Sequence, residues 1–351
     1  MKIARLLVLI PMMVSLACAA ESVELRKLYA RKVEMSLSAA ARADIGDAAL
    51  ANFPVLVHLS SGIPGFSYSD FKETDGHDLA FGSDDGTELP YEIDTWNPQG
   101  ESLVWVKVPE LVADTKITCY YGGARNEGNS PTGVWSGYHA VWHLNPGAVG
   151  LDSAGNGFDL TVVEGSSADY AGPFGSTGVA LTNALKVLAS KANTVDSTFT
   201  VSGWYRCTAA CAKTARVVSK LDAWNSAKGY GLQYNQGHTS IVLLCNGVKK
   251  SVSHANSESN WNHISYAAKW GSSRLDANGG TATATDNVWI TYDDSPLRLL
   301  GENQMGEEFR LRRGMAEALY TKMEHQTMAD ADFLAYQRVR NTAQGLVIYC
   351  R

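Results

Sequence analysis

Oxygen-bearing side chains and glycines share one short loop of the chain. In the run Asp152-Ser153-Ala154-Gly155-Asn156-Gly157, Asp152 and Asn156 offer side-chain oxygens in a segment that glycine makes easy to bend. Such oxygens are the ligands that a hard cation prefers. The EF-hand pattern is not met, because Ala154 and Val163 stand at ligand positions. Calcium is therefore the one cofactor that the sequence suggests, and an Asx-stabilised turn is the alternative.

Aromatic and amide side chains gather in a second segment, around a glycine-rich hairpin. Exposed aromatic rings stack on the apolar faces of sugars, while amide groups bond sugar hydroxyls. The alternative for each aromatic side chain is packing in a core. The segment predicts a saccharide-binding surface made of Trp224, Tyr230, Gln233, Tyr234 and Asn235.

Catalytic motifs are mostly missing from the sequence. Glu92-Ile93-Asp94 resembles the start of the family 16 glycosidase motif, in which two glutamates flank an aspartate on one strand. Cleavage of a glycosidic bond needs paired carboxylates, but Trp96 and Asn97 stand where the second glutamate belongs. No nucleophile elbow, paired-histidine zinc motif or glycine-rich nucleotide loop occurs. We expect a non-catalytic protein, with a weak glycoside hydrolase as an alternative.

The N-terminus has the organisation of a Sec signal peptide. Lys2 and Arg5 precede an apolar run from Leu6 to Leu16, and small residues follow before Glu21. We expect a signal peptide at 1–19 and a secreted, periplasmic or surface location. Lipidation of Cys18 is the alternative. No later stretch is apolar enough to predict a transmembrane segment.

The five cysteines that remain after cleavage are an odd number, so at least one thiol stays unpaired. Cys207 and Cys211 are close enough to form a short-loop disulfide in an oxidising compartment. The pairing of Cys119, Cys245 and Cys350 is left open. A zinc site is disfavoured, because the chain lacks further ligands at fixed spacing.

Charge excludes one group of partners. The full chain has 30 basic and 36 acidic residues, and two of the basic residues belong to the signal peptide. An acidic chain without basic runs argues against nucleic acid and anionic lipid as partners.

Alternation of apolar and polar residues predicts a mainly β fold of two β-sandwich, jelly-roll-like domains. The polar run 124–134 reads as a linker between a first domain at 20–123 and a second at 135–342, with a tail at 343–351. We assign Trp142, Trp204 and Trp261 to the core.

A short C-terminal helix completes the predicted fold. Thr327 would cap it with Asp330 as the capping-box partner. Phe333, Tyr336 and Val339 would then lie on one helix face.

Two family resemblances cover most of the chain after residue 25. Residues 26–123 resemble the bacterial domain-of-unknown-function 2341 family, through Asp75-Gly76-His77-Asp78 and Leu89-Pro90-Tyr91-Glu92-Ile93, among other runs. Residues 138–340 resemble a laminin-G-like, concanavalin-A-like lectin or glucanase jelly roll, through Val141-Trp142-His143 and Trp261-Asn262-His263-Ile264.

These resemblances imply an exported protein in a glycan-rich setting, sometimes associated with proton-channel proteins of the energy-transducing type. The jelly-roll family often adds an acidic ligand near its last strand to a calcium loop. The matching position is Ala316, so the adjacent Glu317 is the candidate that joins Asp152 and Asn156.

The sequence therefore predicts a binding protein that recognises polysaccharide or glycoconjugate through its second domain. The competing hypothesis is an envelope scaffold or adhesion protein whose partner is another protein.

Overall fold

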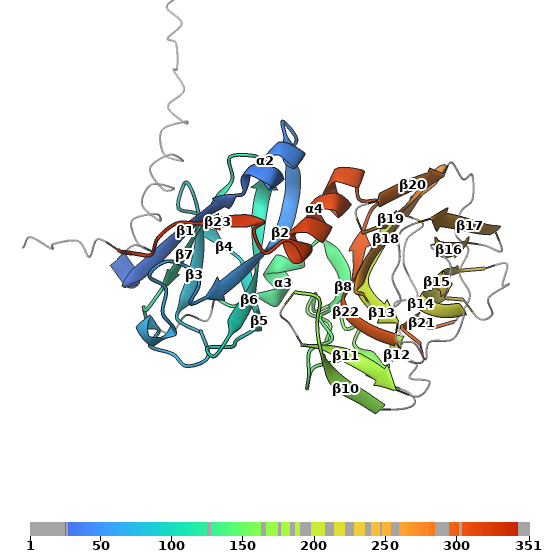
Figure 1. The fold of residues 1–351 in the computed structure, drawn as a ribbon, viewed down its shortest axis with the longest axis horizontal. Coiled ribbons are helices and arrows are strands. Elements are labelled where there is room, and N and C mark those ends of the chain that lie inside the picture. Colours follow the sequence, from blue (N-terminus) through green and yellow to red (C-terminus); the bar gives the residue numbers. More distant parts are fainter. Residues whose placement is uncertain are drawn as a thin grey trace, which may run out of the picture. The chain divides into compact units, whose positions relative to one another are not determined.

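The protein is seen in a computed structural model, in which strands dominate and pair antiparallel (Figure 1). The structure describes residue 25, residues 27–124, residue 126, and residues 128–162, 166–174, 177–182, 187–189, 198–207, 214–221, 228–235, 240–245, 248–253, 260–278, 280–284, 295–301 and 304–342. The predicted signal peptide lies outside these residues. Within them, no helix is long and apolar enough to cross a membrane.

The chain divides into two compact units, residues 1–130 with 332–351, and residues 131–331. The division at residue 130 falls inside the predicted linker. The C-terminal boundary differs from the prediction, because residues 332–342 belong to the first unit and not to the jelly roll.

The first unit holds two antiparallel sheets. Its elements are β1 (Arg31–Leu37), α2 (Ala39–Ile45), β2 (Leu50–Ser60), the 3-10 turn η1 (Tyr68–Asp70), β3 (Leu79–Ser83), β4 (Glu88–Leu89), β5 (Tyr91–Thr95), β6 (Glu101–Leu111), β7 (Lys116–Tyr121), β23 (Leu334–Tyr336) and β24 (Arg340–Asn341). One sheet has the order β23-β1-β7-β3-β4, with β24 also on β1, and the other has the order β2-β6-β5. Alternation in β1 buries Val33, Met35 and Leu37, as the period-two pattern requires.

The second unit is also built of two antiparallel sheets. Its elements are α3 (Pro131–Val134), β8 (Tyr138–Trp142), β9 (Leu160–Val162), β10 (Ser166–Ala171), β11 (Thr177–Thr182), β12 (Val187–Ala189), β13 (Phe199–Cys207), β14 (Thr214–Lys220), β15 (Tyr230–Asn235), β16 (Ser240–Cys245), β17 (Val248–Ser253), β18 (Asn262–Lys269), β19 (Ser272–Ala277), β20 (Gly280–Ala284), β21 (Leu297–Leu299), β22 (Gln304–Arg313) and α4 (Ala318–Ala329). One sheet runs β10-β11-β22-β13-β18-β19-β20 with β8 beside β22, and the other runs β17-β16-β15-β14-β21-β12-β9.

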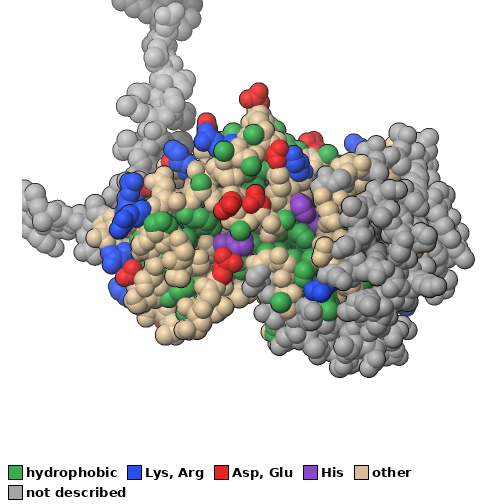
Figure 2. All heavy atoms as spheres, viewed as in Figure 1, with side chains coloured by type: hydrophobic (Ala, Val, Ile, Leu, Met, Phe, Trp, Pro, Cys, Tyr) green, Lys and Arg blue, Asp and Glu red, His purple; other side chains and the backbone are tan. Residues whose placement is uncertain are grey.

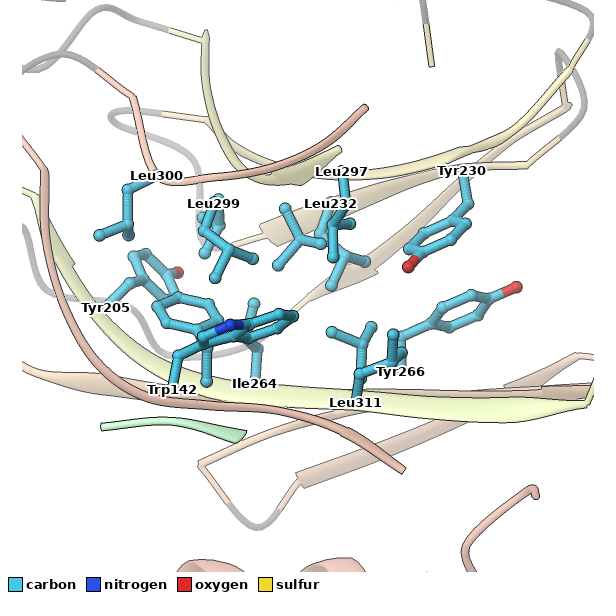
Figure 3. Close-up of a cluster of buried hydrophobic side chains, with 14 of the residues drawn as sticks. Trp142, Tyr205, Tyr230, Leu232, Ile264, Tyr266, Leu297, Leu299, Leu300 and Leu311 are labelled. Atoms are coloured by element: carbon cyan, nitrogen blue, oxygen red, sulfur yellow. The ribbon is translucent and has the colours of Figure 1, made fainter. Parts of the chain in front are cut away.

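The apolar core of the second unit lies between its two sheets, as Figure 3 shows. Ile264, Tyr266 and Leu311 come from the first of these sheets, and Leu232 and Leu299 face them from the second. Burying such side chains supplies most of the free energy that holds two sheets face to face. The predicted mainly β fold with two sandwich-like domains is confirmed.

Helix α4 corrects the predicted position of the C-terminal helix. It spans Ala318–Ala329, so Thr327 lies buried inside it and does not cap it. Phe333 and Tyr336 follow the helix, and Tyr336 ends strand β23. The capping-box pattern at Thr327 and Asp330 was therefore a false signal.

Candidate functional site

Strand alternation gives the first sheet of the second unit a polar outer face. In β18, Ile264, Tyr266 and Ala268 enter the core, so the residues between them face outward. In β19, Leu275 and Ala277 enter the core. The residues that therefore share the outer face are His263, Ser265, Ala267 and Lys269 of β18, and Ser272, Arg274 and Asp276 of β19.

A cavity of about 430 Å³ opens at one end of this face. Its volume lies in the range of small-ligand sites. The described residues that line it are Thr198, Lys269, Ser272, Arg274, Met315, Ala316, Glu317 and Ala318. The cavity thus joins the β18–β19 hairpin to the segment that leads into α4.

Arg274 forms a fixed polar wall of the cavity. It is buried, and its Nε donates to Asp276 Oδ2 at 2.7 Å while its Nη2 donates to Thr321 Oγ1 at 3.2 Å. Asp276 is held in turn by the hydroxyls of Thr321 and Thr281. Two anchored donors fix the plane of the guanidinium. Its Nη1 has no hydrogen-bond partner in the described part of the chain.

An exposed tryptophan lies in the turn of the same hairpin. Lys269 pairs with Ser272, so Trp270 and Gly271 form a two-residue turn between β18 and β19. Gly271 has a φ of 76°, a conformation that glycine adopts without strain. Trp270 keeps 48% of its surface exposed, which is unusual for so large an apolar side chain. The turn that holds Trp270 therefore joins two residues that line the cavity, Lys269 and Ser272.

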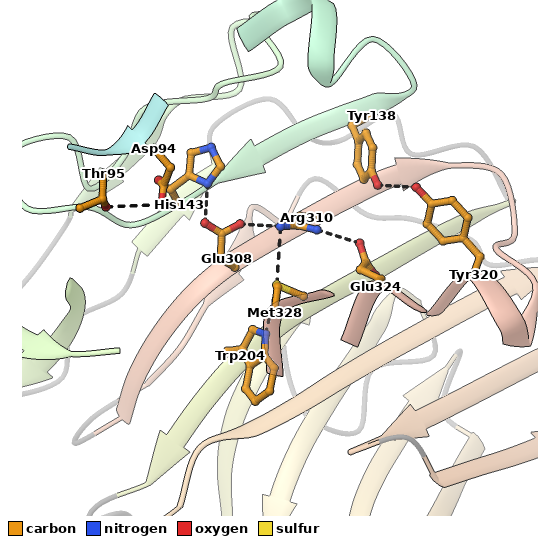
Figure 4. A network of polar contacts seen from close by, with 10 residues as sticks. All are labelled: Asp94, Thr95, Tyr138, His143, Trp204, Glu308, Arg310, Tyr320, Glu324 and Met328. Carbon is orange, nitrogen blue, oxygen red and sulfur yellow. Dashed lines mark hydrogen bonds and ion pairs between the residues drawn. The ribbon is translucent and has the colours of Figure 1, made fainter. Parts of the chain in front are cut away.

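Helix α4 covers the polar outer face beyond the cavity, through buried charged groups (Figure 4). Arg310 of β22 binds Glu308 at 2.7 Å and Glu324 of α4 at 3.2 Å. Glu308 also accepts a hydrogen bond from His143 Nδ1 at 2.5 Å. This ladder of four side chains ties β8, β22 and α4 together.

Electrostatics keep Arg310 and Glu308 charged although both are buried. Burial by itself would lower the pKa of Arg310, but the carboxylates of Glu308 and Glu324 raise it. Burial would likewise raise the pKa of Glu308, but His143 and Arg310 lower it. Removal of one partner would leave an uncompensated buried charge, so the ladder acts as a unit.

An aromatic cluster lies beside the ladder. Trp204 packs against His263 and His325, with ring centroids 5.2 and 5.4 Å away, and its Nε1 lies 3.3 Å from Met328 Sδ. Burial lowers the pKa of both histidines, and for His263 the neighbouring His325 and Arg310 lower it further. Trp204 is thus buried as predicted, but under α4 and not between the sheets. Trp142 does lie between the sheets, whereas Trp261 is only partly buried.

The calcium loop is organised as a turn. The Asp152 carboxylate accepts hydrogen bonds from the backbone N–H groups of Val141, Ala154, Asn156 and Phe158, at 3.0 to 3.2 Å. The Asn156 amide donates to the carbonyl oxygens of residues 138 and 139. Four N–H donors occupy the lone pairs that a cation would need, so the geometry favours the Asx-stabilised turn.

Glu317, the third predicted calcium ligand, lies at the N-cap of α4, where its side chain makes no capping hydrogen bond. It lines the cavity.

The predicted aromatic surface is corrected at Tyr230. This side chain is fully buried between the sheets, with its ring centroid 4.8 Å from that of Phe199, so neither face is open to a sugar. Gln233 is also buried. Trp224 lies outside the described residues, as do the side chains of Tyr234 and Asn235.

The predicted disulfide stays a prediction. Cys207 is buried at the end of β13, and Cys211 lies outside the described residues.

In the first unit, the sequence motif that contains Gly76 and Asp78 has a structural role. A Cβ at Gly76, whose φ is 78°, would lie 2.6 Å from the Trp96 ring, and Trp96 Nε1 donates to the Thr74 carbonyl at 2.9 Å. Asp78 is fully buried and accepts a hydrogen bond from the Lys72 N–H at 2.8 Å. Burial raises the pKa of Asp78, against several backbone hydrogen bonds that lower it. Glycine, aspartate and tryptophan in this motif shape one loop.

A second cavity, of about 490 Å³, lies in the first unit and is rich in carboxylates. The three aspartates among them have partners in the protein. Asp84 pairs with Lys116 at 3.2 Å, Asp114 pairs with Arg42 at 3.0 Å, and Asp85 accepts from the N–H of Thr87. We therefore interpret it as a solvated turn surface. Acidic and basic side chains both appear on the face that Figure 2 shows.

These features define a class: a mainly β protein of two units, one of which carries an open cavity lined by polar and apolar side chains, next to a turn with an exposed tryptophan. Residues 75–137 match the family model described as Domain of unknown function (DUF2341), which confirms the predicted resemblance for that part of the chain. No curated protein matches the chain.

Several solved structures are similar to part of the chain. The binding domain of Paraclostridial Mosquitocidal Protein 1 is 15% identical, with 55% of this chain and 52% of that chain covered and a TM-score of 0.45. The Botulinum neurotoxin serotype D binding domain is 14% identical, with 54% of this chain and 50% of that chain covered and a TM-score of 0.42. The match spans about half the length of these toxin domains.

Domain 4 of AbnA, a GH43 extracellular arabinanase from Geobacillus stearothermophilus in complex with arabinotriose, is 15% identical to this chain. That match covers 54% of this chain and 98% of the other, with a TM-score of 0.43.

Sequence reasoning missed Lys269 and Arg274, which line the cavity, and Trp270, which follows Lys269 in the turn. A usable signal was present, because Lys269-Trp270-Gly271-Ser272 follows an apolar strand and ends it with a glycine turn. A tryptophan inside such a turn is difficult to bury.

Proposed function

We propose that the second unit binds saccharide in the cavity beside Trp270, and that the chain is an exported, non-catalytic binding protein. The observation that carries the proposal is the exposure of Trp270 in the turn that joins Lys269 and Ser272, two residues that line a cavity of about 430 Å³. An aromatic ring provides the flat apolar surface that a pyranose face needs.

The groups around the cavity suit sugar hydroxyls. Thr198 and Ser272 offer hydroxyls that both donate and accept, and Arg274 offers donors in a fixed orientation. Groups that are held in place before the ligand arrives lose little entropy on binding. An open polar site of this kind supports binding in the micromolar to millimolar range.

The lining favours binding over hydrolysis. Glycosidic cleavage uses two carboxyl groups on opposite sides of the bond, and Glu317 is the one carboxylate among the described residues that line the cavity.

Affinity electrophoresis of the mature chain through a panel of neutral and acidic polysaccharides tests the proposal. At least one polysaccharide should retard the protein, and Trp270→Ala should weaken the retardation on the order of fivefold. Leu151→Ala is the matched control, because Leu151 is an exposed apolar residue of the same unit, 57% exposed, that does not line the cavity.

Three results would count against the proposal. Absence of retardation by every polysaccharide would favour the envelope-scaffold hypothesis. Release of reducing ends during incubation would favour a hydrolase. Equal losses in Trp270→Ala and Leu151→Ala would place the site elsewhere.

A further inference from the structure

We infer that the saccharide bound in this cavity carries a carboxylate, as in a chain of uronic acid residues. The inference rests on the proposed function and names the ligand class for the same site. It follows from the charges that line the cavity and from how each is held.

The sheet wall of the cavity carries two cationic side chains, Lys269 and Arg274, of which Arg274 is ion-paired with Asp276 at 2.7 Å. Lys269 and Arg274 stand on neighbouring strands, on the same outer face, and Lys269 is paired in register with Ser272, two residues before Arg274. Lys269 is exposed and has no ion-pair partner in the described part of the chain.

Arg274 is the stronger element of this wall. Its residue is only 6% exposed, yet it lines the cavity, and Asp276 and Thr321 hold Nε and Nη2 while Nη1 stays without a partner among the described residues. Nη1 is open to the solvent of the cavity, so an acceptor on a ligand can reach it. A carboxylate is the acceptor that an arginine prefers, because its two oxygens match the planar fork of donors.

Helix α4 strengthens the positive potential on the other wall. Ala318, the first residue of this 12-residue helix, lines the cavity, and the Glu317 side chain does not cap the first turn. The uncapped N–H groups and the helix dipole favour an anion there.

Glu317 places a negative charge in the same cavity and limits how many anionic groups the ligand can carry. Its exposed carboxylate lines the same cavity, so a densely charged ligand such as a sulfated polymer would meet repulsion. The chain as a whole is acidic, with a formal net charge of −6. A saccharide with one carboxylate per ring therefore fits this local pair of cations better than a polymer that carries several anionic groups per ring.

The test compares two forms of one polymer. Polygalacturonate is compared with the same polymer after reduction of its carboxyl groups to primary alcohols, so that only the charge changes. The mature full-length chain is run through gels that contain either form. We expect retardation by polygalacturonate to exceed that by the reduced polymer by about tenfold or more, and to fall in 0.5 M salt.

Three variants locate the effect. Lys269→Gln should weaken retardation by polygalacturonate about tenfold and leave retardation by the reduced polymer almost unchanged. Glu317→Gln should strengthen retardation by polygalacturonate about threefold, because it removes the repulsion. Arg338→Gln is the charge-matched control, because Arg338 is exposed in the first unit and should change neither value.

The outcomes separate the two proposals. Equal retardation by both polymers, lost in Trp270→Ala, would overturn the carboxylate inference and leave the proposed function standing. Preference for polygalacturonate that survives Lys269→Gln and Glu317→Gln unchanged would also overturn it, because the charge would then be read elsewhere. If neither polymer nor any other saccharide retards the protein, the proposed function fails together with the inference.

Discussion

A single carboxylate organises the loop that the sequence marks as a calcium site. Asp152 is buried and gathers four backbone N–H groups, two of them from its own loop within four residues. Spacing of oxygen ligands alone does not distinguish a carboxylate that binds a cation from one that binds amide hydrogens. The sequence gives the loop but not the direction in which its oxygens point.

Asp152→Ala should therefore destabilise the second unit whether or not calcium is present. Several N–H groups would lose their acceptor, at a cost of about 3 kcal/mol or more. Urea unfolding of both proteins, with 5 mM calcium and with chelator, measures the loss. A melting temperature that rises with calcium in the wild type alone would instead restore the calcium site.

Gly203 allows β13 to pack closely against β22 at a β-bulge. The register shifts between Ser202 and Trp204 because β22 has an extra residue there, and Glu308 takes a φ of 55°. This bulge turns Phe309 inward over Gly203, so closely that a Cβ on Gly203 would overlap its ring. The glycine was visible in the sequence, but its partner 106 positions later was not.

Gly203→Ala should destabilise the second unit by about 1–3 kcal/mol, the usual cost of overpacking. Phe309→Leu, which removes the ring, should be less destabilising in the Gly203→Ala background than alone. A chemical-denaturation cycle of the four proteins measures the coupling. Additive losses would show that the two residues do not clash.

At the scale of elements, α4 shows why the predicted helix fell in the wrong place. Its buried face includes Thr321, Glu324 and Thr327, because the sheet beneath it is polar. A helix that packs on charges leaves no apolar stripe in the sequence. The strands, in contrast, were predictable, because each packs on an apolar core that imposes period-two alternation.

The same packing makes the attachment of α4 sensitive to acid. His263 of β18 and His325 of α4 lie 5.4 Å apart beside Trp204, with Arg310 near, and the folded protein lowers the pKa of both histidines. More than about one pH unit above the ordinary histidine pKa of about 6.5, both side chains are neutral in either state. At lower pH the two histidines bind protons in the unfolded chain but not in the folded chain, so the free energy of unfolding falls as pH falls.

The expected slope is up to about 1.4 kcal/mol per pH unit for each histidine. Urea unfolding between pH 5.5 and 8, followed by tryptophan fluorescence, measures it. The double variant His263→Gln/His325→Gln should lose most of the slope, and Lys322→Gln on the same helix should keep it. Equal slopes in the wild type and the double variant would refute the role of the pair.

At the scale of the whole molecule, the segment 332–342 belongs to the first unit, although no local sequence pattern predicts this. β23 pairs with β1 through Met35, Ser36 and Leu37, and the Ser38 N–H donates to the Phe333 carbonyl at 3.0 Å. Phe333 and Leu334 are buried there. The sequence shows which segments are strands, but pairing between residues some 300 positions apart depends on surfaces that only the folded chain assembles.

Truncation of the chain after Ala331 should therefore destabilise the first unit, although most of that unit lies near the other end of the sequence. Loss of β23 and β24 leaves β1 with an open edge and removes two buried apolar side chains, each worth about 1.5–3 kcal/mol. Hydrogen exchange should quicken across residues 31–37 and stay unchanged across 262–277 of the second unit.

A chain that ends after Thr342 keeps both strands and serves as the control. Retardation by saccharide should be equal in the two truncated proteins, because the cavity belongs wholly to the second unit. Faster exchange across 262–277, with 31–37 unaffected, would mean that the last strands stabilise the jelly roll instead.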